Sequence, residues 1–394
     1  MESLETIRRK QAQWTSVRRD IHAHPELAYG EHRTAGLVAR HLASLGLEVH
    51  EGIGQTGVVG VLRGGRGLRA IGLRADMDAL PIQERNEFAH RSRNQGCMHA
   101  CGHDGHTTML LAAADALAAR PDFDGTVYFV FQPAEEGEAG ARAMIEDGLF
   151  DRFPMESIFG MHNWPGLPAG TFAVHDGPVM ASADRFDIEV TGHGAHAAMP
   201  HLGTDPVVAA AALVQAIQTI VSRTLDPLDA AVVSTTMFNA GEAYNVIPDR
   251  ARLSGTVRAF SEAVRKRVVA RLEALCQGIA TSHDVQVRIA FHDGYPATVN
   301  TTAEAAICAQ VARTLVGSEQ VLTGERPSMG AEDFAFFLRE KPGCYVWIGN
   351  GQEAGGCMLH NPRYDFNDEI IAPGAAFWVE LVRTLLAPHS RTVG

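Results

Sequence analysis

Side chains that commonly bind zinc and similar divalent ions are concentrated in four short segments that lie far apart in this chain. The segments span residues 101–106 (CGHDGH), 132–136 (QPAEE), 160–165 (GMHNWP) and 359–362 (LHNP). They contain a thiol, several imidazoles and two adjacent carboxylates, which are the ligand types that zinc prefers. Because these positions extend over roughly 260 residues, a compact zinc finger is excluded. We therefore expect a globular fold in which loops from distant parts of the chain converge.

The composition is that of an ordinary globular protein and disfavours several functional classes. At 394 residues, with 46% hydrophobic and 20% charged residues, the chain is long enough for two domains. A net charge of −12 disfavours binding to nucleic acid or to an anionic membrane surface. Residues 1–20 have no apolar signal-peptide core, and no apolar run approaches the length of a membrane span. We expect six reduced cysteines and a cytoplasmic location.

Before residue 170, the hydrophobic pattern predicts helices and strands in alternation. We expect helices at 4–21, 34–45 and 106–119, and strands at 57–62, 68–73, 126–131 and 158–161. This order predicts an α/β sheet that is covered by helices. The candidate ligands of this region follow strand ends or begin a helix, which is where open α/β sheets place their sites.

The region 182–292 has a different order of elements and contributes none of the candidate ligands. We expect strand 185–191, helix 205–223, strands 230–238 and 251–260, helix 263–282 and strand 285–291. The order βαββαβ is typical of a split-βαβ sandwich. We interpret 182–292 as an inserted α+β domain, with 1–181 and 293–394 forming the domain around it. The outer layer of that surrounding domain is expected to be completed by helices at 302–315, 331–339 and 373–386.

Two of the four segments have a spacing that suits metal binding. Cys101 and His103 are two residues apart, so in extended backbone their side chains leave the same side of the chain. Glu135 and Glu136 are neighbours, so one can bind a metal ion while the other faces a substrate water. Two unpaired carboxylates side by side repel each other, and a metal ion compensates for that repulsion. The alternative for these glutamates is a solvated surface position.

His162 follows a short apolar strand, and His360 lies between leucine and Asn-Pro. Either alone is more typical of a hydrogen-bonded structural histidine. With Cys101, His103 and Glu136, however, they exceed the three or four protein ligands of one zinc ion, which favours a second metal ion. Asp78 is placed to orient a ligand histidine. The flanking His22, His24, His99 and His106 are further histidines near these motifs, and for His22 and His24 we expect hydrogen bonding instead.

Several longer motifs add a resemblance to a known family. They are residues 18–26 (RRDIHAHPE), 75–81 (ADMDALP) and 194–200 (GAHAAMP), together with the motif around His360. Over nearly its whole length the chain resembles the M20 metallopeptidase family, in its amidohydrolase branch. That branch includes hippurate hydrolases, N-acyl-amino-acid amidohydrolases and plant auxin-conjugate hydrolases.

The resemblance implies an α/β, mixed-sheet domain that holds two metal ions, and an inserted lid and dimerisation domain. The metal ligands it implies are Cys101, His103, Glu136, His162 and His360, with Glu135 as general base. The broader family has histidine in place of Asp76 and aspartate in place of Cys101. A thiolate favours softer ions, so we expect zinc, with nickel, cobalt or manganese as alternatives.

The implied reaction is hydrolysis of a linear amide, in which Glu135 takes a proton from a metal-activated water and passes it to the leaving amine. The resemblance points to His196, in the inserted domain, as an oxyanion donor, with an ordinary surface histidine as the alternative. The free carboxylate of an N-acyl amino acid suits a bidentate arginine, for which Arg258, assisted by Asn245, is a candidate. Gly330 is a further candidate backbone donor, and Arg258 capping a strand edge is the structural alternative.

Two other functions remain open at this point. A dipeptidase needs a group that holds the substrate's free ammonium, and no dedicated carboxylate for that purpose is identifiable. A non-catalytic metal-binding or ligand-binding protein is disfavoured by Glu135, because binding alone needs no spare base. We expect a homodimer or homotetramer formed through the inserted domain. The acyl group and the amino acid of the substrate are not defined by the sequence.

Overall fold

The chain divides into two compact units, which are described separately. The computed structural model describes residues 2–351 and 357–388. Unit 1 comprises Met1–Gly177, Val299–Arg326 and Asp333–Gly394, and unit 2 comprises Pro178–Thr298 and Pro327–Glu332. Unit 2 therefore covers the region expected as the inserted domain, with slightly wider bounds, and it also takes in the short segment that contains Gly330.

Unit 1 is built on a mixed eight-stranded sheet, so the expected α/β class with a mixed sheet is confirmed. Its strand order is β1-β2-β4-β3-β5-β16-β6-β15. The strands are β1 (Glu48–Ile53), β2 (Gly57–Gly64), β3 (Ala70–Asp76), β4 (Gly125–Gln132), β5 (Ser157–Pro165), β6 (Phe172–Val174), β15 (Val321–Leu322) and β16 (Gly343–Gly351). The central strands β4, β3, β5 and β16 run parallel to one another. Their carboxyl ends consequently lie at the same edge of the sheet.

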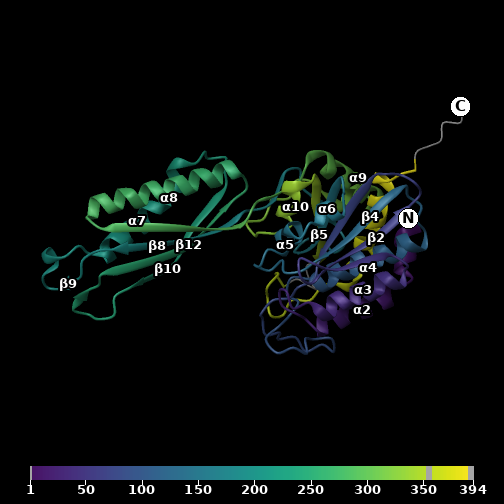
Figure 1. Cartoon of the computed structure of the whole chain (residues 1–394), viewed down its shortest axis with the longest axis horizontal. Helices are drawn as coiled ribbons and strands as arrows, with labels where there is room; N and C mark the ends of the chain where they lie inside the picture. The colour runs from purple at the N-terminus through teal and green to yellow at the C-terminus, as the bar shows by residue number, and fades with distance from the viewer. Residues whose placement is uncertain (1, 352–356, 389–394) are drawn as a thin grey trace. The chain divides into compact units, whose positions relative to one another are not determined.

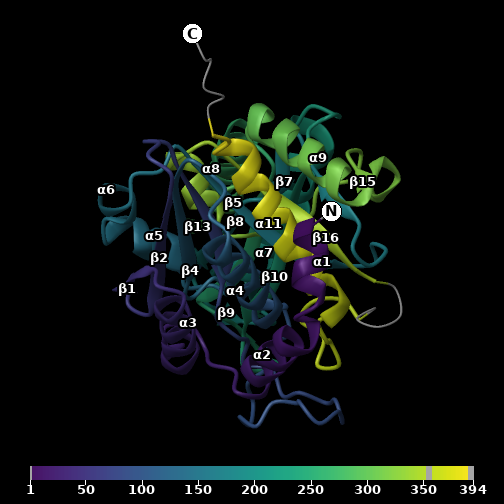
Figure 2. The same ribbon diagram turned by 90° about the vertical axis from the view of Figure 1, so that its right-hand side faces the viewer.

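The helices of unit 1 pack along this sheet and against one another. They are α1 (Glu2–Arg8), α2 (Gln11–Ala23), α3 (His32–Ser44), α4 (His103–Ala119), α5 (Gly140–Glu146), α6 (Leu149–Arg152), α9 (Thr302–Val316), α10 (Ala335–Glu340) and α11 (Ile371–Leu385). Helix α4 is buried along most of its length because it packs against β3, α2 and α11. Figure 2 shows α1 beside α11, so the first and the last helix of the described chain lie in one layer.

Unit 2 has the βαββαβ order expected for the inserted domain. Its sheet has the order β10-β12-β8-β13 and is antiparallel. The elements are β8 (Ala183–Thr191), α7 (Pro206–Thr219), β10 (Ala231–Ala240), β12 (Arg250–Ala259), α8 (Glu262–His283) and β13 (Gln286–Tyr295), with a short pair formed by β9 (Ala195–His196) and β11 (Val246–Ile247). Helices α7 and α8 lie together on one face of the sheet (Figure 1).

Some expected elements differ from the structure. The helix expected at 4–21 is two helices, α1 and α2, and the helix expected at 331–339 begins only at Ala335. In the sheet of unit 1, strands β1, β6, β15 and β16 were not expected. One stretch, Pro206–Thr224, does reach the length and hydropathy of a membrane span, with a mean hydropathy of 1.4 over 18 residues. In the structure this stretch packs on β8, β12 and α8 of unit 2, which accounts for its apolar side.

Candidate metal centre

The candidate ligands of unit 1 come from the carboxyl ends of three neighbouring parallel strands and from the start of α4. Asp78 follows β3, Glu135 and Glu136 follow β4, and His162 lies near the end of β5. Asp76 and Gln132 are register partners at the ends of β3 and β4, which brings the two following loops together. This is the sheet edge at which open α/β folds bind ligands.

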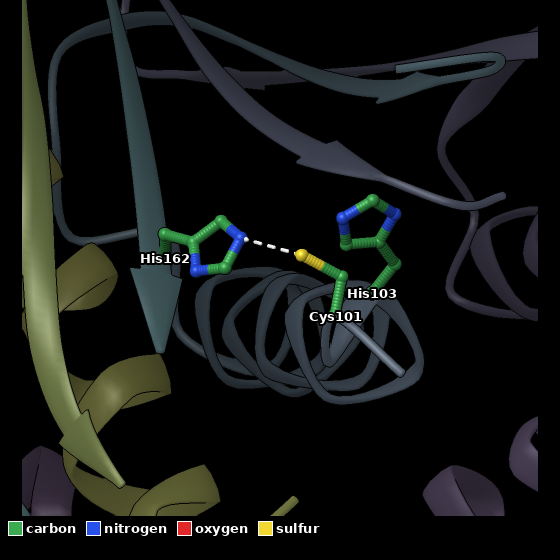
Figure 3. A group of neighbouring side chains, drawn as sticks. All are labelled: Cys101, His103 and His162. Carbon is green, nitrogen blue, oxygen red and sulfur yellow. Dashed lines mark hydrogen bonds between the residues drawn. The ribbon is translucent and has the colours of Figure 1, made fainter. Parts of the chain in front are cut away.

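Cys101 and His103 are positioned by the first turn of α4. Gly102 precedes the helix in a left-handed conformation, with φ 92°, and a Cβ atom there would lie 2.1 Å from Oδ1 of Asn163. Glycine is therefore required at this position. The turn places both side chains on the side of the helix that faces β5, where the Cys101 sulfur lies between the rings of His103 and His162 (Figure 3). The distance from the sulfur to Nε2 of His162 is 3.3 Å.

A second group of ligand atoms shares the same sulfur. Cys101, His103 and His162 have ligand atoms within 4.8 Å of one another, and so do Cys101, Glu136 and His360. Nε2 of His360 lies 3.3 Å from Oε1 of Glu136, which in turn is 4.0 Å from Nε2 of His103. The five predicted ligands therefore lie together although they come from four distant segments.

Glu135 lies beside this cluster and is distinct from Glu136. Glu135 is buried, whereas Glu136 is partly exposed. A carboxylate oxygen of each lies within 4.8 Å of a ring nitrogen of His103. Oε1 of Glu135 also accepts a hydrogen bond of 3.3 Å from the backbone N–H of Asp333. The two neighbouring carboxylates thus share the contact with His103 but differ in burial and in their other contacts.

Asp78 contacts two of the predicted ligands. Nδ1 of His103 is 2.9 Å from the backbone oxygen of Asp78 and 3.2 Å from its Oδ1 atom. Its other carboxylate oxygen, Oδ2, accepts from the backbone N–H of Glu136 at 2.9 Å. Nδ1 of His103 therefore donates toward Asp78, and Nε2 is the ring atom that faces the cluster. A carboxylate behind a ligand histidine is a common arrangement at metal sites.

The donor set fits divalent metal ions by a test that is independent of the motifs. Nε2 of His103 and Oε1 of Glu136 are buried atoms without a hydrogen-bond partner among the described residues. Buried polar atoms in proteins are nearly always paired. Both atoms face the same cluster of nitrogen, sulfur and oxygen donors, in which the nearest partner of Oε1 is the candidate ligand His360 at 3.3 Å, and a bound cation would satisfy both atoms.

The surroundings of the cluster shift the pKa values of His103 and His162 in opposite directions. Burial disfavours the charged form of His103, but Asp76 and Asp78 outweigh burial and raise its pKa to about 10. Burial lowers the pKa of His162 well below its usual value, and the nearby His106 lowers it further. His162 is therefore neutral at physiological pH, which is the form that binds a metal ion. The carboxylates around His103, by contrast, make the surroundings of its ring favourable for a positive charge.

The structure adds buried polar residues to the site that sequence reasoning did not identify. Nδ1 of His106 lies 2.6 Å from Oδ1 of Asp76, and its Nε2 accepts from the backbone N–H of Asn163 at 3.0 Å. The Asn163 side chain donates to the Tyr364 hydroxyl at 2.5 Å. His106 is one helical turn from His103 on α4, and this spacing was the available signal. Asp76, His103 and His106 also form a group of closely spaced ligand atoms.

The other histidines near the motifs take part in different contacts. Nδ1 of His22 pairs with Oδ2 of Asp104 at 2.8 Å, and Nε2 lies 3.2 Å from Glu84. His24 donates from Nδ1 to the backbone oxygen of Asp20 at 2.8 Å. Both histidines are hydrogen-bonded, as expected. His99 is buried, and neither of its ring nitrogens has a hydrogen-bond partner among the described residues.

The remaining predicted site residues lie in unit 2. His196, on β9, pairs with Val246 of β11, and the backbone oxygen of Asn245 accepts from Ala197 at 3.0 Å. The backbone N–H of Ala198 donates to Nδ1 of His196 at 3.1 Å. His196 therefore carries its proton on Nε2, and this exposed atom is a hydrogen-bond donor.

Arg258 and Gly330 differ in how they are engaged. Arg258 is half-buried on β12, which lies between β10 and β8, so the strand-edge alternative is not supported. Burial lowers its pKa, and Arg258 has no ion pair with any residue that the structure describes. The Gly330 N–H, by contrast, already donates to Oγ of Ser328 at 3.0 Å. A role for Gly330 as a substrate donor requires that bond to break.

Comparison with known proteins agrees with this geometry. A model of "Peptidase family M20/M25/M40" matches residues 72–384. The chain belongs to this family. It is 44% identical to a hippurate hydrolase of Campylobacter jejuni, over 94% of this chain and 96% of the relative. It is 40% identical to IAA-amino acid hydrolase ILR1-like 2 of Arabidopsis thaliana, over 91% of this chain and 82% of the relative.

A solved structure in the family has the same fold. The YXEP protein of Bacillus subtilis, described as a dinuclear metal binding peptidase from the M20 family, has a TM-score of 0.85 and 35% identity. The match covers 96% of this chain and 99% of that one. The chain is thus a metal-dependent amidohydrolase of the M20 family, as predicted from its motifs.

Proposed function

We propose that this M20 amidohydrolase cleaves the amide bond of N-acyl amino acids to a carboxylic acid and a free amino acid, with two divalent metal ions. The observation that carries the proposal is the Cys101 sulfur, which belongs to two groups of ligand atoms at once. Five ligands that share one thiolate exceed the three or four protein ligands of a single zinc ion, which favours two cations. The hippurate hydrolase and the auxin-conjugate hydrolase among the relatives support the substrate class, and the dinuclear relative supports the metal count.

The ligands proposed for the two ions are Cys101, His103, Glu136, His162 and His360. When bound, the ions supply Lewis acidity toward a water molecule and the amide carbonyl. The thiolate and the three imidazoles favour zinc, with manganese, cobalt and nickel as alternatives. Asp78 keeps His103 in the tautomer that presents Nε2 to the cluster.

Glu135 is the proposed general base. Its carboxylate takes a proton from the attacking water and returns it to the nitrogen of the leaving amine. Burial and closeness to the cluster support this role, because a base must lie within reach of the water whose proton it takes. Glu136, its neighbour, is a ligand and is not available for proton transfer.

The proposed substrate contacts of unit 2 are His196, Arg258, Asn245 and Gly330. The proton on Nε2 of His196 supports its proposed role as an oxyanion donor. Arg258 is half-buried and, although Asp184 is near enough to raise its pKa, it forms no ion pair among the described residues; such a guanidinium suits the free α-carboxylate of an N-acyl amino acid. In this proposal unit 2 is the lid, and it assembles the site when it closes.

We further propose a cytoplasmic homodimer or homotetramer assembled through unit 2. Strand β10 is an edge of its sheet, and Met237 and Phe238 on that strand are exposed. An exposed apolar edge strand is a common site of subunit pairing. Size-exclusion chromatography with light scattering checks the assembly.

The substrate class is tested by a hydrolysis screen after reconstitution with Zn²⁺, Mn²⁺, Co²⁺ or Ni²⁺. The substrates are benzoyl-, acetyl-, long-chain- and indoleacetyl-amino acids, with Gly-Gly as the dipeptide. We expect turnover of at least one acyl amino acid and negligible turnover of Gly-Gly. A preference for Gly-Gly would instead identify a dipeptidase, and inactivity toward every substrate of the screen would contradict the proposed substrate class.

A further inference from the structure

The loop that carries Glu135 and Glu136 has an unusual backbone. Ala134 and Ala139 have left-handed conformations, with φ 52° and 56°, although neither is glycine. The backbone oxygen of Ala134 accepts from the Gly140 N–H at 3.0 Å, which closes the loop on itself. A Cβ atom on Gly140 would lie 1.7 Å from the Pro133 oxygen, so the closure is tight. Left-handed alanines persist only where the surroundings impose them.

Glu31 supplies such a constraint from about a hundred residues away. Its side chain is fully buried, and Oε1 accepts from the backbone N–H of Ala134 at 2.9 Å. The other oxygen, Oε2, accepts from the hydroxyl of Thr56 at 2.5 Å. Both carboxylate oxygens are thus used, and one of them holds the residue directly before Glu135. A hydrogen bond to a carboxylate is shorter and stronger than one between neutral groups.

Two further buried carboxylates hold the same loop. Oδ2 of Asp78 accepts from the backbone N–H of Glu136 at 2.9 Å. Oδ2 of Asp333 accepts from the backbone N–H of Ala141 at 2.8 Å. The loop is therefore anchored before, within and after the glutamate pair by acids from three separate segments. Of the three acids, Glu31 is the one that binds the N–H of the residue directly before Glu135, and within the described part of the chain it contacts none of the predicted metal ligands.

A purely local role for Glu31 is the alternative, and Glu26 illustrates what such a role looks like. The two oxygens of Glu26 accept from the backbone N–H groups of Arg33 and Thr34, at 2.8 and 2.9 Å. These bonds stabilise the first turn of α3, which begins at His32. Glu31 lies in the same segment and its carboxylate also interacts with its own backbone N–H, but its bonds to other residues go to Thr56 and to the loop after β4. The contacts of Glu31 therefore serve the loop.

We propose that Glu31 is a positioning residue that holds Ala134 in its left-handed conformation and thereby fixes the directions of Glu135 and Glu136. The inference rests on the proposed roles of these two glutamates. Without the Glu31 carboxylate the peptide at Ala134 is free to turn, and both following side chains move with it. A displacement of about 1 Å at a catalytic group costs on the order of 100-fold in rate.

The test combines kinetics with a measurement that needs no substrate. Glu31→Ala is expected to lower kcat about 100-fold while KM changes less than about threefold, because the loss concerns the reacting groups. Hydrogen–deuterium exchange of peptides covering residues 132–141 is expected to become at least about tenfold faster in the same variant. Glu31→Gln keeps one acceptor oxygen for Ala134, so it should restore most of both properties. The full-length, metal-reconstituted enzyme is used throughout.

Glu26→Ala is the matched control, because it removes a carboxylate of the same segment whose side-chain bonds go to Arg33 and Thr34 and not to the loop. It should lower the unfolding temperature and leave kcat and the exchange of 132–141 as in the wild type. If Glu31→Ala does not fold, Thr56→Val takes its place, since it removes the bond that fixes the other carboxylate oxygen. That variant is expected to show a smaller decrease in kcat and a smaller increase in the exchange of residues 132–141.

The outcomes separate this inference from the proposed function. Faster exchange with lower kcat supports the positioning role. Unchanged exchange of 132–141 in Glu31→Ala overturns it, whatever the activity. If the wild type hydrolyses no amide, the proposed function fails. The role of Glu31 is then still decided by the hydrogen–deuterium exchange of residues 132–141 and by the affinity for Zn²⁺ in Glu31→Ala. The affinity is informative because Glu136 is a proposed metal ligand. If Glu26→Ala lowers kcat as much as Glu31→Ala does, the inference is contradicted, because both variants then show a general loss of structure.

Discussion

Nδ1 of His103 lies 2.9 Å from the backbone oxygen of Asp78 and 3.2 Å from its carboxylate. This contact fixes the proton of the imidazole on the side away from the cluster. It leaves Nε2, a buried atom without a hydrogen-bond partner among the described residues, as the ligand atom. Asp78 also holds the backbone of Glu136, so one carboxylate orients two proposed ligands.

Replacing Asp78 by alanine should therefore weaken metal binding. The loss of a carboxylate behind a ligand histidine typically lowers metal affinity about 10- to 100-fold. Competition with a chromogenic chelator measures the affinity for Zn²⁺. Asp78→Asn keeps an acceptor oxygen, so its affinity is expected to lie between those of the wild type and Asp78→Ala. Equal affinity in wild type and Asp78→Ala would mean that the contact does not orient a ligand.

Stability should decline as the pH rises above neutrality because of His22. Burial alone would lower the pKa of this imidazole, but Asp104 and Glu84 outweigh burial and raise it from 6.5 to about 9. A raised pKa stabilises the fold fully below pH 6.5, and this contribution is lost as the pH rises through about 9. The difference corresponds to about 3 kcal/mol of unfolding free energy.

Urea unfolding between pH 6 and pH 9.5 checks this dependence. The His22→Asn variant is expected to be less stable at pH 6 and to show a flatter decline than the wild type. Parallel curves for the two proteins over this range would exclude His22 as the source of the decline.

Arg258 should set the preference for a free α-carboxylate. An N-acyl amino acid and its α-amide differ only in the group that the guanidinium is proposed to bind. In the wild type KM should be lower for the acid, and in Arg258→Ala this preference should disappear through a higher KM for the acid alone. Steady-state kinetics on both substrates measures it, and a preference that survives the substitution rules the arginine out.

Much of the site was predictable from sequence because its residues come in short motifs. The spacing of Cys101 and His103 and the adjacent glutamates each carried a chemical meaning without knowledge of the fold. The βαββαβ order of unit 2 was equally readable, since its strands alternate between buried and exposed residues. Such a pattern reflects one face that packs on helices and one that does not.

The rest depended on contacts between distant residues. Strand β16, which is buried along its whole length, was not predicted, although the equally buried β3 was. The break between α1 and α2 has no proline or glycine to mark it. Glu31 was invisible as a loop anchor because its partner, the N–H of Ala134, belongs to the backbone and leaves no trace in the sequence.

The central claim is that the distant segments form one centre for two metal ions, with Glu135 as a base that is not a ligand. The most direct measurement is the metal content of the reconstituted Glu135→Gln variant, by mass spectrometry, together with its turnover of an N-benzoyl amino acid. We predict two ions per chain, as in the wild type, and a loss of turnover of about 100-fold or more. Retained turnover, or fewer ions in the variant than in the wild type, would contradict the account.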